Sequence, residues 1–280
     1  MARSSRTSRR GPRPAGSGKR TVAPSRPRGP VPKTPGELDA MAAAGAVLAE
    51  CHDQLAAEVG VGVTTGHLDE LAETFIRSRG GTPAFKGYPG PTPFPASICA
   101  SINDEVVHGF PGPYALREGD VFSLDIGVVL DGWVADSART HGIGTVSPIA
   151  ARLIEVTRTA LERGIIAARV GNRVGDIGHA VQTEVEAAGF SVVQSLVGHG
   201  VGRSMHEEPQ VPNFGRPGTG LELREGFVIA IEPMVNAGAH EVFLAEDGWT
   251  IASKDGSLSA HWEHTVAVTA DGPRILTLAR

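Results

Sequence analysis

The stretch SLDIGVVLDGWVADSA, residues 123–138, is the feature that most constrains the fold of this chain. Its centre, Asp131-Gly132, is a favoured two-residue hairpin turn, and the segments on both sides are rich in apolar residues. The pattern therefore predicts two antiparallel strands in which Leu130 pairs with Trp133. Once that pair is set, every other cross-strand pair of the hairpin follows from it.

The predicted register places two acidic side chains on the same face of the sheet. Asp125 faces Ala138 and Asp136 faces Gly127, so the two aspartates are diagonal neighbours, about 7 Å apart at the backbone. Two carboxylates at this separation can lean together around cations, whereas two buried anions without a cation are unfavourable. The alternative is that both aspartates face solvent on the polar side of an edge hairpin.

Three further residues have the chemistry of metal ligands. His199 lies between two glycines in LVGHGVGRSMHEEPQVP, where the backbone can approach closely and an imidazole nitrogen can reach a metal. Glu232, in IAIEPMVNAG, and Glu263, in LSAHWEHTVAVT, lie at or inside strands that are otherwise apolar. With Asp125 and Asp136 they form an oxygen-rich set with one nitrogen. Such a set suits Mn, Fe or Co at least as well as Zn, and it can bridge two ions about 3.5–4 Å apart.

Competing catalytic motifs are absent from the sequence. His206 of HEEPQ has no second histidine four residues later, which excludes a zincin helix. GHGVGRS lacks the spacing and the ending of a phosphate-binding loop. The chain has no GxSxG elbow, and neither Cys51 nor Cys99 lies in a catalytic cysteine signature.

Composition allows a folded protein of one large or two small domains. The 280 residues are 41% hydrophobic, which is enough for a substantial core. There is no run of about 18 apolar residues that would predict a membrane helix, and the N-terminus lacks the apolar core of a secretory signal. The two cysteines have no metal-binding or disulfide spacing, so a reducing compartment and a cytoplasmic location are expected.

Residues 1–36 differ in composition from the rest of the chain. They carry ten Lys or Arg and no Asp or Glu, which leaves 16 of the 26 basic residues and all 31 acidic ones for residues 37–280. Because the segment is rich in Arg, Pro, Ser and Gly, we predict a disordered extension. It could bind a ribosome or another anionic surface, offer its PxxP units at Pro24–Pro30 to an SH3-like groove, or only keep the chain soluble. It lacks the Leu, Ile and Phe of a mitochondrial transit helix.

From Glu37 onward, pairs of helices alternate with strands. Helical spacing predicts helices from Glu37 to Gly60 and over GHLDELAETFIRSRGG. In the second half it predicts one from Ser147-Pro148 to about Arg169 and one over GDIGHAVQTEVEAAG. The strands are predicted in ASICASI, FVIAIEPMV, AHEVFLAEDGWTIAS and HWEHTVAVT. Since hairpins link most strands, we expect an α+β fold with helices on one face of a largely antiparallel sheet, and the repeated order indicates an internal duplication.

Five motifs resemble, in order and spacing, those of type I methionine aminopeptidases of the M24 metallopeptidase family. They are SINDEVVHG, LDIGVVLDGWVADSA, GHGVGRSMHEEP, IEPMVNAG and SLSAHWEHTV. The resemblance covers residues 37–280, which it implies are a single catalytic domain with a pita-bread fold of two pseudo-twofold halves. The short segment between His206 and Glu232 leaves no room for the helical insertion of type II enzymes.

The resemblance also implies a site for two divalent metal ions and the role of each residue in it. By motif position, the implied ligands are Asp125, Asp136, His199, Glu232 and Glu263, of which Asp136 and Glu263 bridge the ions. The implied reaction is removal of the N-terminal methionine from nascent proteins or peptides with a small second residue, by attack of a hydroxide that bridges the metals. Glu232 would move the proton, His206 would stabilise the oxyanion, and His108 would position the substrate.

Motif position further implies a small apolar pocket for the methionine side chain. Its candidate residues are Phe85, Tyr88, Phe94, Cys99 and Trp249, each of which could equally belong to an ordinary core. The sequence departs from the family at Val134-Ala135, where a His-Gly pair is common, and at Gly127, where Thr is frequent. We expect Gly127 to loosen the support of the bridging Asp136 and to alter metal affinity.

Two alternatives remain, a proline-directed pita-bread aminopeptidase and a pita-bread binding module without catalysis. Proline-directed relatives usually have a folded N-terminal domain, which residues 1–36 cannot supply. Some pita-bread proteins are binding modules that have lost metal ligands, whereas all five ligand types are present here. We therefore expect a hydrolase whose partners are the N-termini of nascent polypeptides, and we expect neither a membrane nor DNA as a partner.

Overall fold

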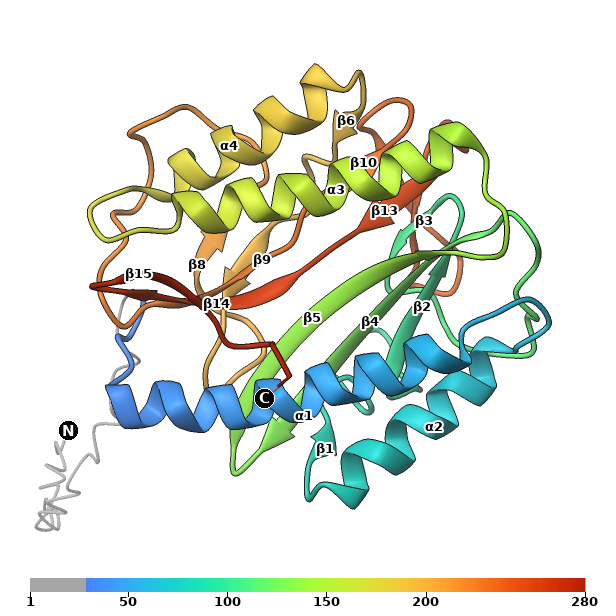
Figure 1. Ribbon diagram of the computed structural model, residues 1–280, viewed down its shortest axis with the longest axis horizontal. Coiled ribbons are helices and arrows are strands. Elements are labelled where there is room, and N and C mark those ends of the chain that lie inside the picture. Colours follow the sequence, from blue (N-terminus) through green and yellow to red (C-terminus); the bar gives the residue numbers. More distant parts are fainter. Residues whose placement is uncertain (1–28, 280) are drawn as a thin grey trace, which may run out of the picture.

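The structure, a computed structural model, describes residues 29–279 of the chain (Figure 1). Most of the predicted extension, residues 1–28, therefore lies outside the described residues. Two pairs of helices alternate with strands, as predicted: α1 (Pro35–Glu58), α2 (Thr65–Ser78), α3 (Pro148–Ala167) and α4 (Val174–Ala187). Over this range, no helix combines the length and the apolar character needed to cross a membrane.

The first half builds its sheet around the predicted hairpin. Its strands are β1 (Thr82–Pro83), β2 (Ile98–Ile102), β3 (Glu105–Val107), β4 (Val121–Leu130) and β5 (Trp133–Gly142). Strand β4 pairs antiparallel with β5, β2 and β1. Helices α1 and α2 pack against these strands (Figure 1), and buried side chains such as Leu48 and Leu124 form the core between them.

The second half repeats the arrangement with α3, α4 and shorter strands. The strands are β6 (Ser191–Val192), β7 (Gly198–Gly200), β8 (Glu207–Val211), β9 (Val228–Ile231), β10 (Met234–Asn236), β11 (Val242–Leu244), β12 (Ile251–Ser253), β13 (Ser259–His261), β14 (His264–Thr269) and β15 (Gly272–Ile275). The largest sheet has the order β15-β14-β9-β7-β8, and two smaller sheets have the orders β13-β10-β6 and β11-β12-β3. The expected α+β fold with two similar halves is therefore confirmed.

The hairpin has the predicted register. Leu130 pairs with Trp133, and Asp131 between them has a φ of 51°, in the left-handed region that the turn requires. The predicted cross-strand partners of Asp125 and Asp136 are also found. Since these two side chains are only 9% and 5% exposed, the alternative in which both face solvent is wrong.

Two segments that were predicted as continuous strands are broken at a glutamate. Residues 227–235 divide into β9 and β10 at Glu232-Pro233, and residues 261–269 divide into β13 and β14 at Glu263. At each break the chain leaves one sheet and enters another, and Pro233 cannot donate a ladder hydrogen bond. The breaks turn both glutamates out of the regular ladders and toward the first half.

Hydrogen bonds join the two halves at the second break. The Glu263 N–H donates to the carbonyl oxygen of Ala138 on β5 over 3.0 Å. The Thr265 hydroxyl on β14 donates to the carbonyl oxygen of Asp136 over 2.8 Å and accepts from the Asp136 N–H over 3.0 Å. Strand β5 therefore lies against β13 and β14, and we call this contact the seam.

Candidate metal centre

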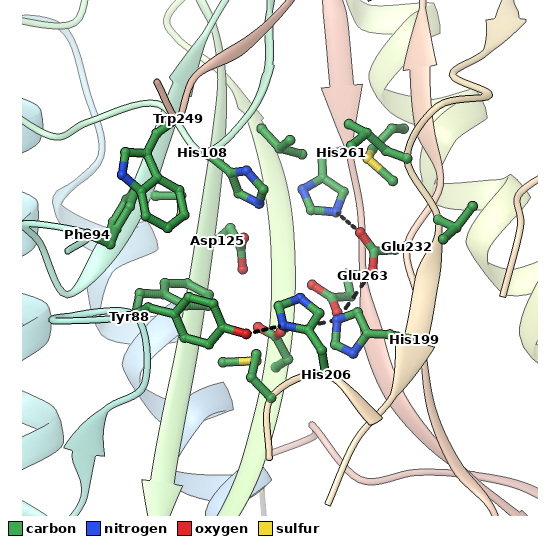
Figure 2. A pocket seen from close by; sticks show the side chains of 18 residues that line it. Tyr88, Phe94, His108, Asp125, His199, His206, Glu232, Trp249, His261 and Glu263 are labelled. Carbon is green, nitrogen blue, oxygen red and sulfur yellow. Dashed lines mark hydrogen bonds and ion pairs between the residues drawn. The ribbon is translucent and has the colours of Figure 1, made fainter. Parts of the chain in front are cut away.

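The five predicted ligands meet in one pocket at the seam (Figure 2). The pocket has a volume of about 180 Å³ and is lined by residues of both halves. Strands β4 and β5 carry Asp125 and Asp136, and β7 carries His199. The two strand breaks carry Glu232 and Glu263.

Several ligand atoms are close enough to share cations. One atom each of Asp136, His199 and Glu263 lie within 4.8 Å of one another. The Nε2 atom of His199 is 3.8 Å from Oδ2 of Asp136 and 3.5 Å from Oε1 of Glu232. Asp125 and Glu232 line the same pocket, outside this tightest group.

Burial raises the pKa of all four carboxyl groups. Desolvation raises the pKa of Asp136 to about 7. Desolvation also holds the pKa of Glu263 well above its usual range, and the charges of Asp136, Glu232 and Asp125 add to the effect. The pKa values of Asp125 and Glu232 are high for the same two reasons, burial first and the charge of Asp136 second.

These carboxylates fit a site for divalent cations. Over residues 29–279, their only ion-pair contacts are with histidines. Asp125 Oδ1, Asp136 Oδ1 and Glu263 Oε1 are buried without a hydrogen-bond partner, although a buried charge needs one. Oxygen donors with a single imidazole are ligands that Mn²⁺, Fe²⁺ and Co²⁺ accept. Such cations would therefore be the partners of the carboxylate oxygens that no protein donor reaches.

The glycines on both sides of His199 let its backbone pack closely enough for the ring to enter the pocket. A Cβ at Gly198 would overlap the carbonyl oxygen of Ala230, and one at Gly200 would overlap that of Glu208. The His199 Nδ1–H donates to the Gly200 carbonyl oxygen over 2.9 Å, which leaves Nε2 free to bind a metal. Burial lowers the pKa of His199 to about 4, so the imidazole is neutral at physiological pH.

The two predicted non-ligand histidines lie beside the ligands. His206 is exposed at the pocket, its ring centroid is 4.3 Å from that of His199, and its Nδ1 is 2.6 Å from the Tyr88 hydroxyl. His108 lines the pocket from the loop after β3 and has a φ of 61°, which is strained for a residue with a side chain. Burial lowers the pKa of His108 to about 4.

All five candidates for the apolar pocket line it. Phe94 is central, with ring centroids 5.2 Å from Trp249 and 6.3 Å from Phe85, both in edge-to-face contact. Tyr88 and Cys99 complete the set, and Cys99 pairs directly with Asp125 between β2 and β4. The apolar wall therefore adjoins the ligands.

Six further lining residues were missed from the sequence. They are Val107, Leu196, Val197, Met205, Met234 and His261. Two of them stand next to functional residues, since Met205 precedes His206 and His261 lies two residues before Glu263. The others are apolar residues of short strands and loops, whose pattern does not distinguish them from ordinary core.

Gly127 pairs with Asp136 across the hairpin, and the three atoms nearest to a Cβ added at Gly127 belong to apolar side chains at the pocket wall. A Cβ there would lie 2.8 Å from Met205 Cε and 3.0 Å from Phe85 Cε1. It would also lie 2.9 Å from Ala84 Cβ, whose residue donates its N–H to the Gly127 carbonyl oxygen. Glycine therefore lets the wall approach β4. Residues 134–135, the other departure from the family, are buried in the core.

The described part of the extension packs beside the pocket. The buried Lys33 ammonium forms an ion pair of 2.7 Å with Glu207, which also accepts the N–H of Arg203. These contacts hold the loop that carries His206. Residues 29–33 line a groove of about 700 Å³ that opens onto His206.

Comparison with known proteins identifies the class to which this fold and site belong. The family model described as metallopeptidase family M24 matches residues 39–270. The chain belongs to this family, as its motifs predicted, and it is a metal-dependent hydrolase.

Within this family, the chain is most clearly similar to methionine aminopeptidases. The chain is 51% identical over 248 residues to a methionine aminopeptidase of Clostridium perfringens, with 89% of this chain and 98% of the relative covered. It is 50% identical over 267 residues to methionine aminopeptidase 1 of Mycobacterium tuberculosis, with 92% and 99% covered. The crystal structure of the methionine aminopeptidase from Rickettsia prowazekii superposes with a TM-score of 0.86 at 44% identity, covering 89% of this chain and 100% of that one. A prolidase from Pyrococcus horikoshii, at 19% identity and a TM-score of 0.72, shares the fold.

Replacing Gly127 by alanine is expected to disturb the apolar wall and leave the ligands in place. The added Cβ, 2.8–3.0 Å from its neighbours, overpacks the site, so urea titration should show a loss of about 1–3 kcal/mol in the free energy of unfolding. Gly112→Ala is the control, because a Cβ at Gly112 meets nothing within 4 Å. Calorimetric titration should give both variants the Mn²⁺ affinity of the wild type. A change of affinity in Gly127→Ala alone would instead support the expectation that glycine at this position loosens the support of Asp136 and alters metal affinity.

The stabilisation that a metal provides is expected to grow between pH 6.5 and pH 8. The folded-state pKa of Asp136, about 7, lies above its usual value of 3.8, so this group's contribution to the stability of metal-free protein is full below about pH 3.8 and is lost as pH rises through 7. Cations bind the ionised carboxylate and recover that loss. The buried histidines, with lowered pKa values, stay neutral over this range.

Differential scanning calorimetry in Mn²⁺ and in EDTA measures this effect. The difference in Tm between the two conditions should be larger at pH 8 than at pH 6.5. An equal difference at both pH values would contradict the titration of Asp136 in the folded state.

Proposed function

We propose that the chain is a type I methionine aminopeptidase, a protease that removes the N-terminal methionine from nascent proteins or peptides with a small second residue. The observation that carries the proposal is a pocket in which an acidic ligand set adjoins an apolar wall of aromatic side chains and Cys99. The carboxylates favour a substrate with a cationic α-amino group, and the wall suits a flexible thioether side chain. The relatives that are 51% and 50% identical are named methionine aminopeptidase and methionine aminopeptidase 1.

The proposed metal ligands are the five residues that meet at the seam. Asp125, Asp136, His199, Glu232 and Glu263 would hold two divalent ions, and Asp136 and Glu263 are the ligands that the ions would share. The unpaired buried oxygens of Asp125, Asp136 and Glu263 support their role as ligands. The proposed metals are cobalt, manganese or iron, with zinc as a further candidate, since all four accept oxygen and imidazole ligands.

When bound, the divalent cations supply positive charge at the attacking water and at the scissile carbonyl. Glu232 is the proposed general base, because its carboxylate lies beside His199 at 3.5 Å and borders the pocket. It accepts a proton from the water and passes it to the leaving amine. Burial raises the pKa of Glu232 well above its usual range, which suits a group that must hold a proton between these two steps.

Tyr88 sets the tautomer of His206 in this proposal. Burial raises the pKa of the Tyr88 phenol, so its O–H donates to Nδ1 of His206 over 2.6 Å. Desolvation lowers the pKa of His206, which favours the neutral ring, and the hydrogen bond that Nδ1 accepts from Tyr88 leaves the ring hydrogen on Nε2. Nε2–H then donates to the oxyanion of the tetrahedral intermediate, and His108 positions the substrate backbone.

Peptide turnover across a metal series tests the function. Metal-depleted protein supplied with Mn²⁺, Fe²⁺, Co²⁺ or Zn²⁺ should release methionine from Met-Ala-Ser and should leave Xaa-Pro peptides intact. Asp136→Ala should lower kcat/KM by more than about 100-fold, since a ligand matters more than an outer-shell partner. Glu162→Ala, which changes an exposed acid on α3, is the matched control and should match the wild type.

Other results would identify the alternatives. Cleavage of Xaa-Pro peptides alone would indicate a proline-directed aminopeptidase. Protein that turns over no peptide with any of these metals, and that Asp136→Ala leaves unchanged in metal content, would indicate a binding module.

The proposed compartment is the cytoplasm, where Cys51 and Cys99 stay reduced.

The proposed role of the basic extension is contact with the ribosome. The test is deletion of residues 2–28, which keeps the Lys33 ion pair and the Thr34 cap of α1. Salt-sensitive co-sedimentation with ribosomes should weaken, while cleavage of Met-Ala-Ser stays unchanged. Unchanged co-sedimentation would favour a plain linker or an SH3-like contact.

A further inference from the structure

His261 is held rigidly at the seam. Its N–H donates to the Thr140 hydroxyl oxygen over 2.9 Å, and the same hydroxyl donates to its carbonyl oxygen over 2.7 Å. Ser123 on β4 hydrogen-bonds to this hydroxyl at 2.9 Å. The backbone of β13 is therefore fixed to β5, and through the Thr140 hydroxyl to β4, which places His261 beside the pocket.

The imidazole of His261 points into the pocket with an unused nitrogen. The residue is 2% exposed, and its Nε2 is buried without a hydrogen-bond partner. Figure 2 shows the ring above Glu232, and the nearest carboxylate oxygen is Oε2 of Glu232, at 3.9 Å. An unpaired buried nitrogen lowers stability, so we expect Nε2 to have a hydrogen-bond partner in the functional site.

Glu232 lies between two imidazoles. Its Oε1 faces His199 Nε2 at 3.5 Å and its Oε2 faces His261 Nε2 at 3.9 Å. The Glu232 carbonyl oxygen accepts from the Asn213 side chain over 2.9 Å, which fixes the main chain at the break. Over residues 29–279 no side chain or N–H donates to its carboxylate at hydrogen-bond distance, and His261 is the donor best placed to do so once a small rotation closes the gap.

We propose that His261 is a positioning residue for Glu232: its Nε2–H donates to Oε2 and holds Oε1 toward the ligand cluster. This inference rests on the role of Glu232 in the proposed function. The hydrogen bond leaves one oxygen of the carboxylate for the cation and for the proton of the attacking water. It also keeps the carboxylate from turning toward His108, which lines the same pocket.

Three variants of His261 test the hydrogen bond. His261→Leu removes the donor, His261→Asn provides an amide too short to reach Glu232, and His261→Gln places an amide N–H near the position of Nε2. Calorimetric titration of the metal-depleted proteins with Mn²⁺ should show affinity reduced by about 10- to 100-fold in the Leu and Asn variants and near wild type in the Gln variant. Trp262→Phe, which changes the next residue outside the pocket, is the control and should bind Mn²⁺ as the wild type does.

Kinetics on Met-Ala-Ser supplies the second readout. The Leu and Asn variants should lose roughly 10- to 100-fold in kcat with KM within about twofold, because the proposed contact orients a catalytic group and binds no substrate. His261→Gln should restore kcat. If the Leu variant does not fold, the comparison of Asn with Gln decides the question.

Specific outcomes would overturn the inference. Wild-type affinity and kcat in the Leu and Asn variants would exclude any positioning role, and equal losses in Asn and Gln would show that the imidazole itself is required, as in a metal ligand. The proposed function fails independently. If wild-type protein cleaves no peptide while the Leu and Asn variants bind Mn²⁺ more weakly than the Gln variant, the positioning of Glu232 stands and the proposed reaction does not.

Discussion

The constraint that the surrounding structure must satisfy is the burial of four carboxyl groups in one pocket. Burial raises the pKa of each of them, and their charges reinforce the effect at Glu263. Without a cation, such a group lowers the stability of the folded chain. The surrounding backbone holds the group in place nonetheless, through the hairpin register, the hydrogen bonds of the seam and two strand breaks. The buried carboxylates therefore lower the stability of the metal-free fold, and bound cations would neutralise their charge.

The parts that sequence predicted are those fixed by local chemistry. The two-residue turn at Asp131-Gly132 determined the register of the hairpin, because a tight turn admits one pairing. The Ser147 cap and the proline after it marked the start of α3. The candidate site came from five motifs in order, and the structure brings all of their chosen residues to one pocket. Their individual roles remain proposals.

The parts that sequence did not predict depend on contacts between distant segments. The apolar patterns around Glu232 and Glu263 continue through the breaks, and only the choice of partner sheet shows where each strand ends. The ion pair of Lys33 with Glu207 joins the extension to the second half, and no local sequence pattern predicts it. In the sequence His261 resembles an ordinary strand residue, and its place beside the pocket follows from the hydrogen bonds between its backbone and Thr140, which is distant in the sequence.

The seam has a consequence for the order in which the protein matures. Asp125 lies in the first half of the chain, whereas Glu263 lies close to its C-terminus and reaches the pocket only when β14 has packed against β5. A chain that is still being synthesised therefore lacks a complete ligand set, however well its first hairpin is formed. The complete set of proposed ligands is therefore present only after Glu263 has been synthesised, and a product truncated before Glu263 lacks one of them.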